Sequence, residues 1–494
     1  MDLFAGVVNA LSFSNLLYCF LGCVLGTLVG VLPGLGPAST LSILLPLTVY
    51  LDHTGSIIML AGLYYGTMYG GSTTSILLNI PGEAASVPTC LDGFQMTRQG
   101  RAGQALWIAA VGSFIAGTLG VLAMSFIGPG LAKYALKFGP PEYFALLFFS
   151  LTMLVSLSGT SLIKGMGTGL VGICLATIGV DPFTGVTRLT FGMIETMRGF
   201  DLVPVVVGLF GIGEILSSAE EGVGQIYKGK LGKMMPRGAE LKMGLKASFR
   251  GTLVGFPLGL LPGMIAALSS FMAYDLEKRV SKHPERFGTG VIEGVAAPEA
   301  ANNATAQAGF IPMMALGIPT GPSLAIILAA LMMYGLQPGP VLFQQNTLFV
   351  WTVIGSMYIG NVLLLILNLP LVGLWARISL IPYRFLAPII LGICIIGAYS
   401  PRNTMFDVWV ALGFGILGYF MRKKDWPIAP LILGFILGPL FEQALRQSLT
   451  MGGLTIFLMR PISITLLLLT VFSLTLSIRY LKRIPKGTLE DEKP

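Results

Sequence analysis

The stretch Gly26-Thr-Leu-Val-Gly-Val-Leu-Pro-Gly-Leu-Gly-Pro37 interrupts a long apolar run with glycine and proline. Its pattern returns in the second half of the chain at Gly251-Thr-Leu-Val-Gly-Phe-Pro-Leu-Gly-Leu-Leu-Pro-Gly263. Two further pairs follow in the same order: Ile80-Pro-Gly82 with Ile318-Pro-Thr-Gly321, and Pro204-Val-Val-Val-Gly208 with Pro430-Leu-Ile-Leu-Gly434. Because the order is kept, the pattern predicts that the chain contains two copies of one unit.

The composition around these stretches is that of a membrane protein. Hydrophobic residues make up 54% of the 494 residues and charged residues 11%, whereas a soluble globular protein is about 25% charged. The sequence predicts an all-α polytopic membrane protein with about 11–14 membrane-embedded helices, including broken or re-entrant segments. The clear apolar spans are 15–32, 104–128, 142–158, 201–218, 347–370, 384–399, 405–420 and 453–478. Shorter or broken apolar segments lie near 38–50, 55–70, 74–80, 264–274 and 323–335.

Loop charges give the predicted division and orientation of the halves. We divide the chain into a first transmembrane repeat (1–218), a basic cytoplasmic linker (219–250), a second repeat (251–450), and an extra C-terminal helix with a cytoplasmic tail (451–494). Residues 51–56 contain no Lys or Arg, whereas the equivalent loop 275–287 contains four. Opposite charge at equivalent positions favours inverted repeats over parallel ones, a pattern of secondary transporters.

Several other classes of function lack the residues that they need. The chain has five cysteines without paired metal spacing and only two histidines, both predicted in loops. It has no nucleotide-binding Gly-x-x-x-x-Gly-Lys motif and no residue pattern of a hydrolase. The net charge of +8 lies in loops, so we assign it to membrane topology and expect no nucleic-acid partner. We expect that the protein is not an enzyme.

Hydroxyl and amide side chains flank the interrupted stretches. Irregular backbone at membrane depth is tolerated where it is buried in protein or lines a cavity, and the N-terminus of a half-helix attracts carboxylates. Small residues also permit close helix packing, so packing alone is the competing interpretation. The predicted substrate-binding residues are Gly34, Gly36, Ser39, Ser72, Thr73, Thr74, Ser75, Asn302, Asn303 and Thr305.

A coupling cation is expected near the second break of each half, because unwound carbonyls and half-helix C-termini coordinate Na⁺. The predicted cation region contains Asn79, Gly82, Glu299, Thr320 and Gly321. Glu299 has two open interpretations: it binds or relays a cation, or it caps a half-helix or faces a wet vestibule. Glu83, Asp92, Arg98 and Arg101 are predicted to form a cytoplasmic loop that anchors the re-entrant tip.

Long motifs of this chain resemble the large permease subunit of tripartite tricarboxylate transporters, the TctA family. The resemblance covers essentially the whole chain. It rests on Gly30–Pro37, on Tyr65-Gly-Thr-Met-Tyr-Gly-Gly-Ser-Thr-Thr-Ser-Ile-Leu-Leu-Asn-Ile-Pro-Gly-Glu83 with its continuation to Gly103, and on Gly290-Val-Ile-Glu-Gly-Val-Ala-Ala-Pro-Glu-Ala-Ala-Asn-Asn303.

The resemblance implies a multi-pass symporter of the bacterial cytoplasmic (inner) membrane that imports small carboxylates such as citrate. It implies Na⁺ or H⁺ as the coupling ion and no covalent cofactor. The implied partners are a periplasmic solute-binding protein and a small four-helix membrane subunit within the lipid bilayer. A channel, or an intramembrane enzyme, is the alternative.

Overall fold

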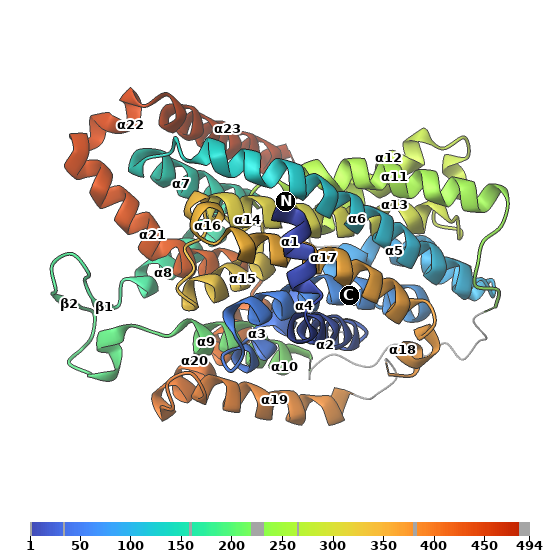
Figure 1. Ribbon diagram of the computed structural model, residues 1–494, viewed down its shortest axis with the longest axis horizontal. Helices are drawn as coiled ribbons and strands as arrows, with labels where there is room; N and C mark the ends of the chain where they lie inside the picture. The colour runs from blue at the N-terminus through green and yellow to red at the C-terminus, as the bar shows by residue number, and fades with distance from the viewer. Residues whose placement is uncertain are drawn as a thin grey trace. The chain divides into compact units, whose positions relative to one another are not determined.

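The computed structural model describes residues 2–32, 35–157, 161–218, 232–263, 266–378 and 383–483. These residues form helices almost throughout and a single two-stranded ribbon (Figure 1). They divide into two compact units, residues 1–135 with 201–420 (unit 1) and residues 136–200 with 421–494 (unit 2).

The helices up to residue 135 and those between 201 and 423 belong mainly to unit 1. Their bounds are α1 Asp2–Ala10, α2 Phe13–Gly30, α3 Pro37–Thr48, α4 His53–Leu78, η1 Ala84–Ser86, α5 Val87–Arg98, α6 Ala102–Ala135, α9 Leu202–Val206, the π-helical η3 Val207–Ile212, α10 Gly213–Ser218, α11 Ala239–Gly259, α12 Ala266–Val280, η4 Pro284–Arg286, α13 Glu293–Ala308, α14 Phe310–Leu316, α15 Pro322–Met333, α16 Pro340–Gln345, α17 Thr347–Asn368, α18 Val372–Ile378, α19 Tyr383–Tyr399 and α20 Met405–Lys423.

Unit 2 contains the remaining elements. Their bounds are α7 Pro140–Leu157, α8 Leu162–Ala176, β1 Gly179–Val180, β2 Thr187–Arg188, η2 Glu195–Arg198, α21 Ile428–Gly452, η5 Gly453–Thr455, α22 Ile456–Met459 and α23 Pro461–Arg483.

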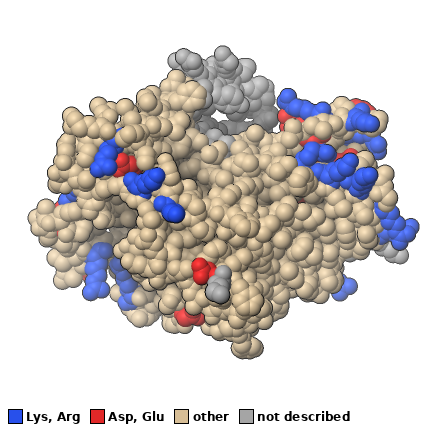
Figure 2. All heavy atoms as spheres, turned by 45° about the horizontal axis from the view of Figure 1, so that its top comes forward, with Lys and Arg blue, Asp and Glu red and all other residues tan. Residues whose placement is uncertain are grey.

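The structure confirms an all-α polytopic membrane protein. Within the described residues, five helical stretches are long and apolar enough to cross a membrane: Phe13–Gly30, Ala102–Ala135, Thr347–Asn368, Met405–Lys423 and Ile428–Met459. Shorter apolar helices such as Pro37–Thr48 and Pro322–Met333 lie among them. In Figure 2, large areas of the visible surface show no Lys, Arg, Asp or Glu side chain, which is typical of a surface that faces lipid.

Two of the apolar helices, α8 and α21, were missing from the predicted spans. Lys164 near the start of α8, and Glu442 and Arg446 in α21, break their apolar runs. The predicted span 453–478 was also wrong in its start, since η5 and α22 precede Pro461, where α23 begins. Proline is favoured in the first turn of a helix and disfavoured inside one, so it fixes this boundary.

Stripes of glycine set the closest helix contacts of unit 1. A Cβ atom added to Gly26 would meet the backbone of Leu63 and Gly66 on α4, the nearest atom being the Leu63 carbonyl oxygen at 2.5 Å. In the second half, a Cβ on Gly255 would meet the backbone of Ala301 on α13. Thus α2 packs on α4 as α11 packs on α13, at equivalent positions of the two predicted repeats.

Glycines also join the last helix of each repeat to its neighbour. In unit 1, Gly208 faces the α20 backbone at Ala411, and in unit 2, Gly434 faces the α8 backbone at Gly169. Since α8 belongs to the first predicted repeat and α20 to the second, each terminal helix contacts a helix of the other repeat. The compact units therefore do not follow the repeat boundary, and the repeat division with its inverted orientation stays a prediction.

Ion pairs attach the two-stranded ribbon of unit 2 to helix α21. In the ribbon, Gly179 of β1 lies opposite Arg188 of β2. Arg188 lies 2.7 Å from Glu442 of α21, and Asp181 lies 3.0 Å from Arg446 of the same helix. The Phe183 backbone N–H, the Thr184 hydroxyl and the Arg446 guanidinium all favour the ionised carboxylate, and they lower the pKa of Asp181 to about 2. Asp181 therefore stays ionised at neutral pH.

Candidate functional site

Two helices of unit 1 end in the same way, at equivalent breaks in the two halves. Helix α4 ends at Asn79, which has a left-handed backbone with φ of 56°, and α14 ends at Gly317 with φ of 73°. In both cases an Ile-Pro pair follows. A left-handed residue closes the helix, and a residue before proline is pushed towards extended backbone. The predicted equivalence of these two breaks thus has a structural counterpart.

The first and second breaks of each half meet. In the second half, the Gly263 backbone N–H donates to the Thr320 carbonyl at 3.1 Å. In the first half, Gly82 lies so close to α2 and α4 that an added Cβ would stand 2.7 Å from the Gly30 carbonyl oxygen and also meet Gly71. Gly34, a predicted substrate residue of the first break, lies outside the described residues.

Glu299 lies at the centre of a buried polar cluster between α4, α5 and α13. Its side chain is fully buried. One carboxylate oxygen accepts a hydrogen bond from Ser72 of α4, and the other accepts from Thr89 of α5 at 2.5 Å. The cluster therefore unites two residues predicted from sequence, Ser72 and Glu299, with Thr89, which was not predicted.

Glu83 approaches the same face of α13. Its stem packs over Gly71 of α4, and its carboxylate accepts from the Asn302 amide at 2.6 Å. Asn302 follows Glu299 by three residues, so their side chains neighbour one another on the helix. Glu83 lies in the predicted non-helical stretch, between α4 and η1, but it is buried and bonded to the core helix α13, and its predicted cytoplasmic side stays a prediction.

No described Lys, Arg or His side chain lies within ion-pair distance of Glu83 or Glu299. Their recorded side-chain partners are hydroxyls and an amide. The Asn302 carbonyl oxygen is buried and has no hydrogen-bond donor. Two buried carboxylates without a cation are costly unless each takes up a proton or a cation is bound. The described residues include no group of three His, Cys, Asp or Glu side chains suited to a transition metal.

A small polar cavity lies next to this cluster. Its volume is about 10 Å³, and it is lined by Tyr69, Ser72, Thr73, Leu106, Ala109, Ala110, Ser113 and Asn368. The Tyr69 hydroxyl and the Asn368 carbonyl oxygen are buried there without a partner. This space is about that of one water molecule, so the cavity suits a single water or a single dehydrated cation.

Asn303 and Thr305 bind neighbouring helices. Asn303 donates to the Ser113 hydroxyl of α6 at 2.8 Å, and Thr305 lies 2.7 Å from the Ser269 hydroxyl of α12. Thr305 is also 2.9 Å from the Gly255 carbonyl of α11. These bonds hold α13 in place and favour the packing interpretation for Thr305. Asn303 also donates to the Glu299 backbone carbonyl at 3.1 Å, so it lies beside the carboxylate cluster.

The other predicted residues lie apart from the carboxylates or bind their own helix. Thr74 and Ser75 bond to the Gly71 carbonyl of α4. Ser39 lies 3.4 Å from Glu214, and Asn79 is exposed. Gly36 and Gly321 are the N-caps of α3 and α15, have no side-chain cap, and would meet nothing within 4 Å if they carried a Cβ.

Asp92 holds the chain that leads into α13. It is fully buried and accepts from the backbone N–H groups of Gly288, Gly290 and Val291 and from the Tyr274 hydroxyl, at 2.8–3.0 Å. Gly288 and Gly290 have φ of 87° and 103°, which lets the backbone turn its N–H groups inward. The prediction that Asp92 lies in a loop was wrong, since Asp92 lies in helix α5, from which it fastens the 288–291 turn.

We expect Asp92→Asn to destabilise this turn by about 3 kcal/mol, because an amide offers one acceptor where the carboxylate serves four donors. Trypsin cleavage of the purified protein after Lys282 or Arg286 should accelerate at least about tenfold. The control is Asp275→Asn, whose exposed i,i+4 pair with Arg279 contributes little. Equal acceleration in both variants would show that Asp92 does not hold the turn.

Broken helices that meet inside an almost wholly helical, apolar protein are features of polytopic membrane transporters. Residues 16–433 match the Tripartite tricarboxylate transporter TctA family. The chain belongs to this family and is a permease subunit of a tripartite transporter, which requires other subunits.

Two relatives from Agrobacterium vitis show how far the likeness extends. One, described as "Uncharacterized 52.8 kDa protein in TAR-I ttuC' 3'region", is 46% identical over 474 residues, which cover 94% of this chain and 93% of that protein. The other, "Uncharacterized protein in TAR-II ttuC' 3'region", is 50% identical over 216 residues, 43% of this chain and 89% of that protein. No solved structure matches the chain.

Proposed function

We propose that this permease subunit imports small carboxylates of the tricarboxylate or citrate type across the bacterial cytoplasmic (inner) membrane. The import is symport with a cation, for which we favour Na⁺ over H⁺. A periplasmic solute-binding protein delivers the anion, and a small four-helix membrane subunit completes the transporter. The family supports the transport role, and the ion, substrate and partners are the added proposal.

The observation that carries the proposal is the pair of buried carboxylates, Glu83 and Glu299, which lacks a cationic partner among the described residues. Acidic side chains inside a membrane protein usually mark an ion path. The unpartnered Asn302 oxygen and the one-water cavity beside Ser72 supply further oxygen ligands and space. Hard monovalent cations prefer oxygen ligands of this kind.

The anion is assigned to the open N-termini of α3 and α15. Each helix has 12 residues, starts with proline after a glycine N-cap, and offers first-turn N–H groups that no cap side chain occupies. The two helices pack against one another. Helix N-termini bind carboxylates through these N–H groups and the positive end of the helix dipole. We therefore propose Gly321 for the anion side together with Gly36, although the sequence pattern had favoured the cation region for Gly321.

The proposal is tested by uptake of labelled citrate into liposomes that contain this subunit with its binding protein and small subunit. We expect saturable uptake that needs an inward Na⁺ gradient. Unlabelled citrate inside the liposomes should accelerate the uptake of labelled citrate. Absence of saturable, cation-dependent uptake for every carboxylate tried would contradict the proposal. Non-saturating conductance would instead identify a channel.

A further inference from the structure

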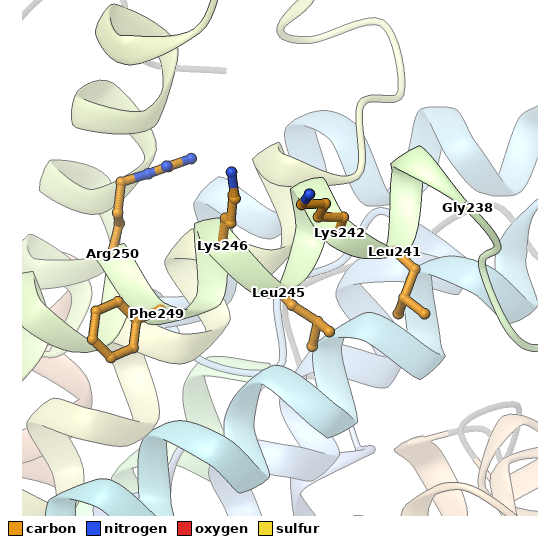
Figure 3. A pocket seen from close by; sticks show the side chains of 7 residues that line it. All are labelled: Gly238, Leu241, Lys242, Leu245, Lys246, Phe249 and Arg250. Carbon is orange, nitrogen blue, oxygen red and sulfur yellow. The ribbon is translucent and has the colours of Figure 1, made fainter.

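The outward side of α11 carries two rows of side chains with different chemistry. Lys242, Lys246 and Arg250 recur every four residues, and so do Leu241, Leu245 and Phe249. Residues four apart share one face of a helix, so a basic row runs beside an apolar row. Together with Gly238 these residues line an open pocket of about 620 Å³ (Figure 3).

The basic row keeps positive charge that the protein does not neutralise. Arg250 forms an ion pair with Glu277 of α12. Glu240, at the start of α11, is 2.6 Å from Arg101 and is thereby occupied. Lys242 and Lys246 are exposed and have no ion-pair partner within the described chain. Figure 3 shows the basic side chains extending to one side of α11 and the leucines and Phe249 to the other.

Along the axis of α11 the surface is basic as far as Arg250, and the exposed side chains beyond Arg250 are apolar. Lys246 is exposed, Phe249 is 52% exposed, and the next residue along the apolar row, Leu253, is 59% exposed. The opposite face of α11 packs closely against α13 through small residues such as Gly251, where an added Cβ would meet the Ala297 backbone. An exposed change of this kind marks the boundary between water and lipid, where lysine heads remain in the polar region.

We propose that this α11 face binds the headgroup of an anionic phospholipid. The phosphate lies against Lys242 and Lys246, and the first part of an acyl chain lies along Phe249 and Leu253. Charge complementarity selects the headgroup, since basic residues at a membrane surface attract anionic lipids. The apolar row selects a lipid over a free anion, because a free phosphate gains nothing from Phe249. This site is separate from the Glu83–Glu299 pair and does not depend on the proposed substrate.

Native mass spectrometry of the purified full chain, after exchange into detergent with equal phosphatidylglycerol and phosphatidylcholine, tests the proposal. We expect the wild type to retain phosphatidylglycerol preferentially. Lys242→Gln with Lys246→Gln should reduce this preference roughly thirtyfold, since each lysine contributes about 1 kcal/mol. The control, Lys278→Gln with Lys282→Gln, removes the same charge from exposed positions at the end of α12 and just beyond it. This control variant should retain the preference for phosphatidylglycerol.

Phe249→Ala and soluble glycerol phosphate separate a lipid from a free anion. Phe249→Ala should lower phosphatidylglycerol retention severalfold, and millimolar glycerol phosphate should not displace the lipid. Equal loss in the α11 and α12 double variants would overturn the proposal, because it would indicate only diffuse attraction. Displacement by glycerol phosphate, with Phe249→Ala unchanged, would also overturn it in favour of a free-phosphate site.

Discussion

Glu299→Gln should reduce Na⁺-driven citrate uptake by about a hundredfold while leaving the protein folded. Glutamine keeps the shape of the side chain but removes the negative charge and replaces one acceptor with a donor. That donor would face the Thr89 or Ser72 hydroxyl, both of which now give hydrogen bonds to Glu299. Hydrogen bonds to charged groups contribute about 1.5–3 kcal/mol each, and a hundredfold change in rate corresponds to about 2.7 kcal/mol.

Uptake should be measured against Na⁺ concentration, because a coupling residue alters the cation dependence and not only the maximal rate. Glu83→Gln should give a similar loss, since Glu83 lies beside the same α13 face through Asn302. The matched control is Glu293→Gln in the first turn of α13, a part-buried carboxylate outside the cluster. If Glu299→Gln kept wild-type uptake and Na⁺ dependence, Glu299 would be a structural residue and the cation site would lie elsewhere.

The helical breaks could be predicted from sequence because proline and glycine act locally. Pro81 and Pro319 force the ends of α4 and α14, and their positions suffice to place both breaks. The glycines of α2 and α11 were equally visible as repeated letters, and close packing is what small residues in membrane helices permit. These features depend on a few adjacent residues.

The partners of the carboxylates could not be predicted, because they are far apart in the chain. Asn302 donates to Glu83 across 219 positions, and Thr89 donates to Glu299 across 210. Glu83 directly follows a Pro-Gly pair, a pattern typical of a turn, so the local sequence favoured a loop and gave no sign of a bond to α13. One signal was present: Glu83, Thr89 and Asp92 all lie between α4 and α6 in a part of the chain without Lys or Arg until Arg98.

Gly255→Ala should destabilise the protein, whereas Gly413→Ala should leave its stability unchanged or raise it. An alanine Cβ at position 255 would stand 2.7 Å from the Ala301 Cα and would also meet the Ala301 carbonyl oxygen. Backbone atoms cannot rotate away, so α11 must move off α13, and overpacking costs about 1–3 kcal/mol. At Gly413 in α20 an added Cβ meets nothing within 4 Å, so the higher helix propensity of alanine, about 1 kcal/mol, acts alone.

Thermal unfolding in detergent, followed by a thiol-reactive dye, measures this difference, because Cys19, Cys23 and Cys394 are buried and become reactive on unfolding. Gly26→Ala should lower the midpoint as Gly255→Ala does, since Gly26 meets the Leu63 backbone of α4 in the equivalent contact. The double variant should show the sum of the two losses, because the two glycines lie on different helix pairs and distant sites add. Equal shifts for Gly255→Ala and Gly413→Ala would mean that the glycine stripes do not set the spacing of these helices. Destabilisation at Gly255 but not at Gly26 would mean that the two halves, though alike in sequence, are not packed by the same contacts.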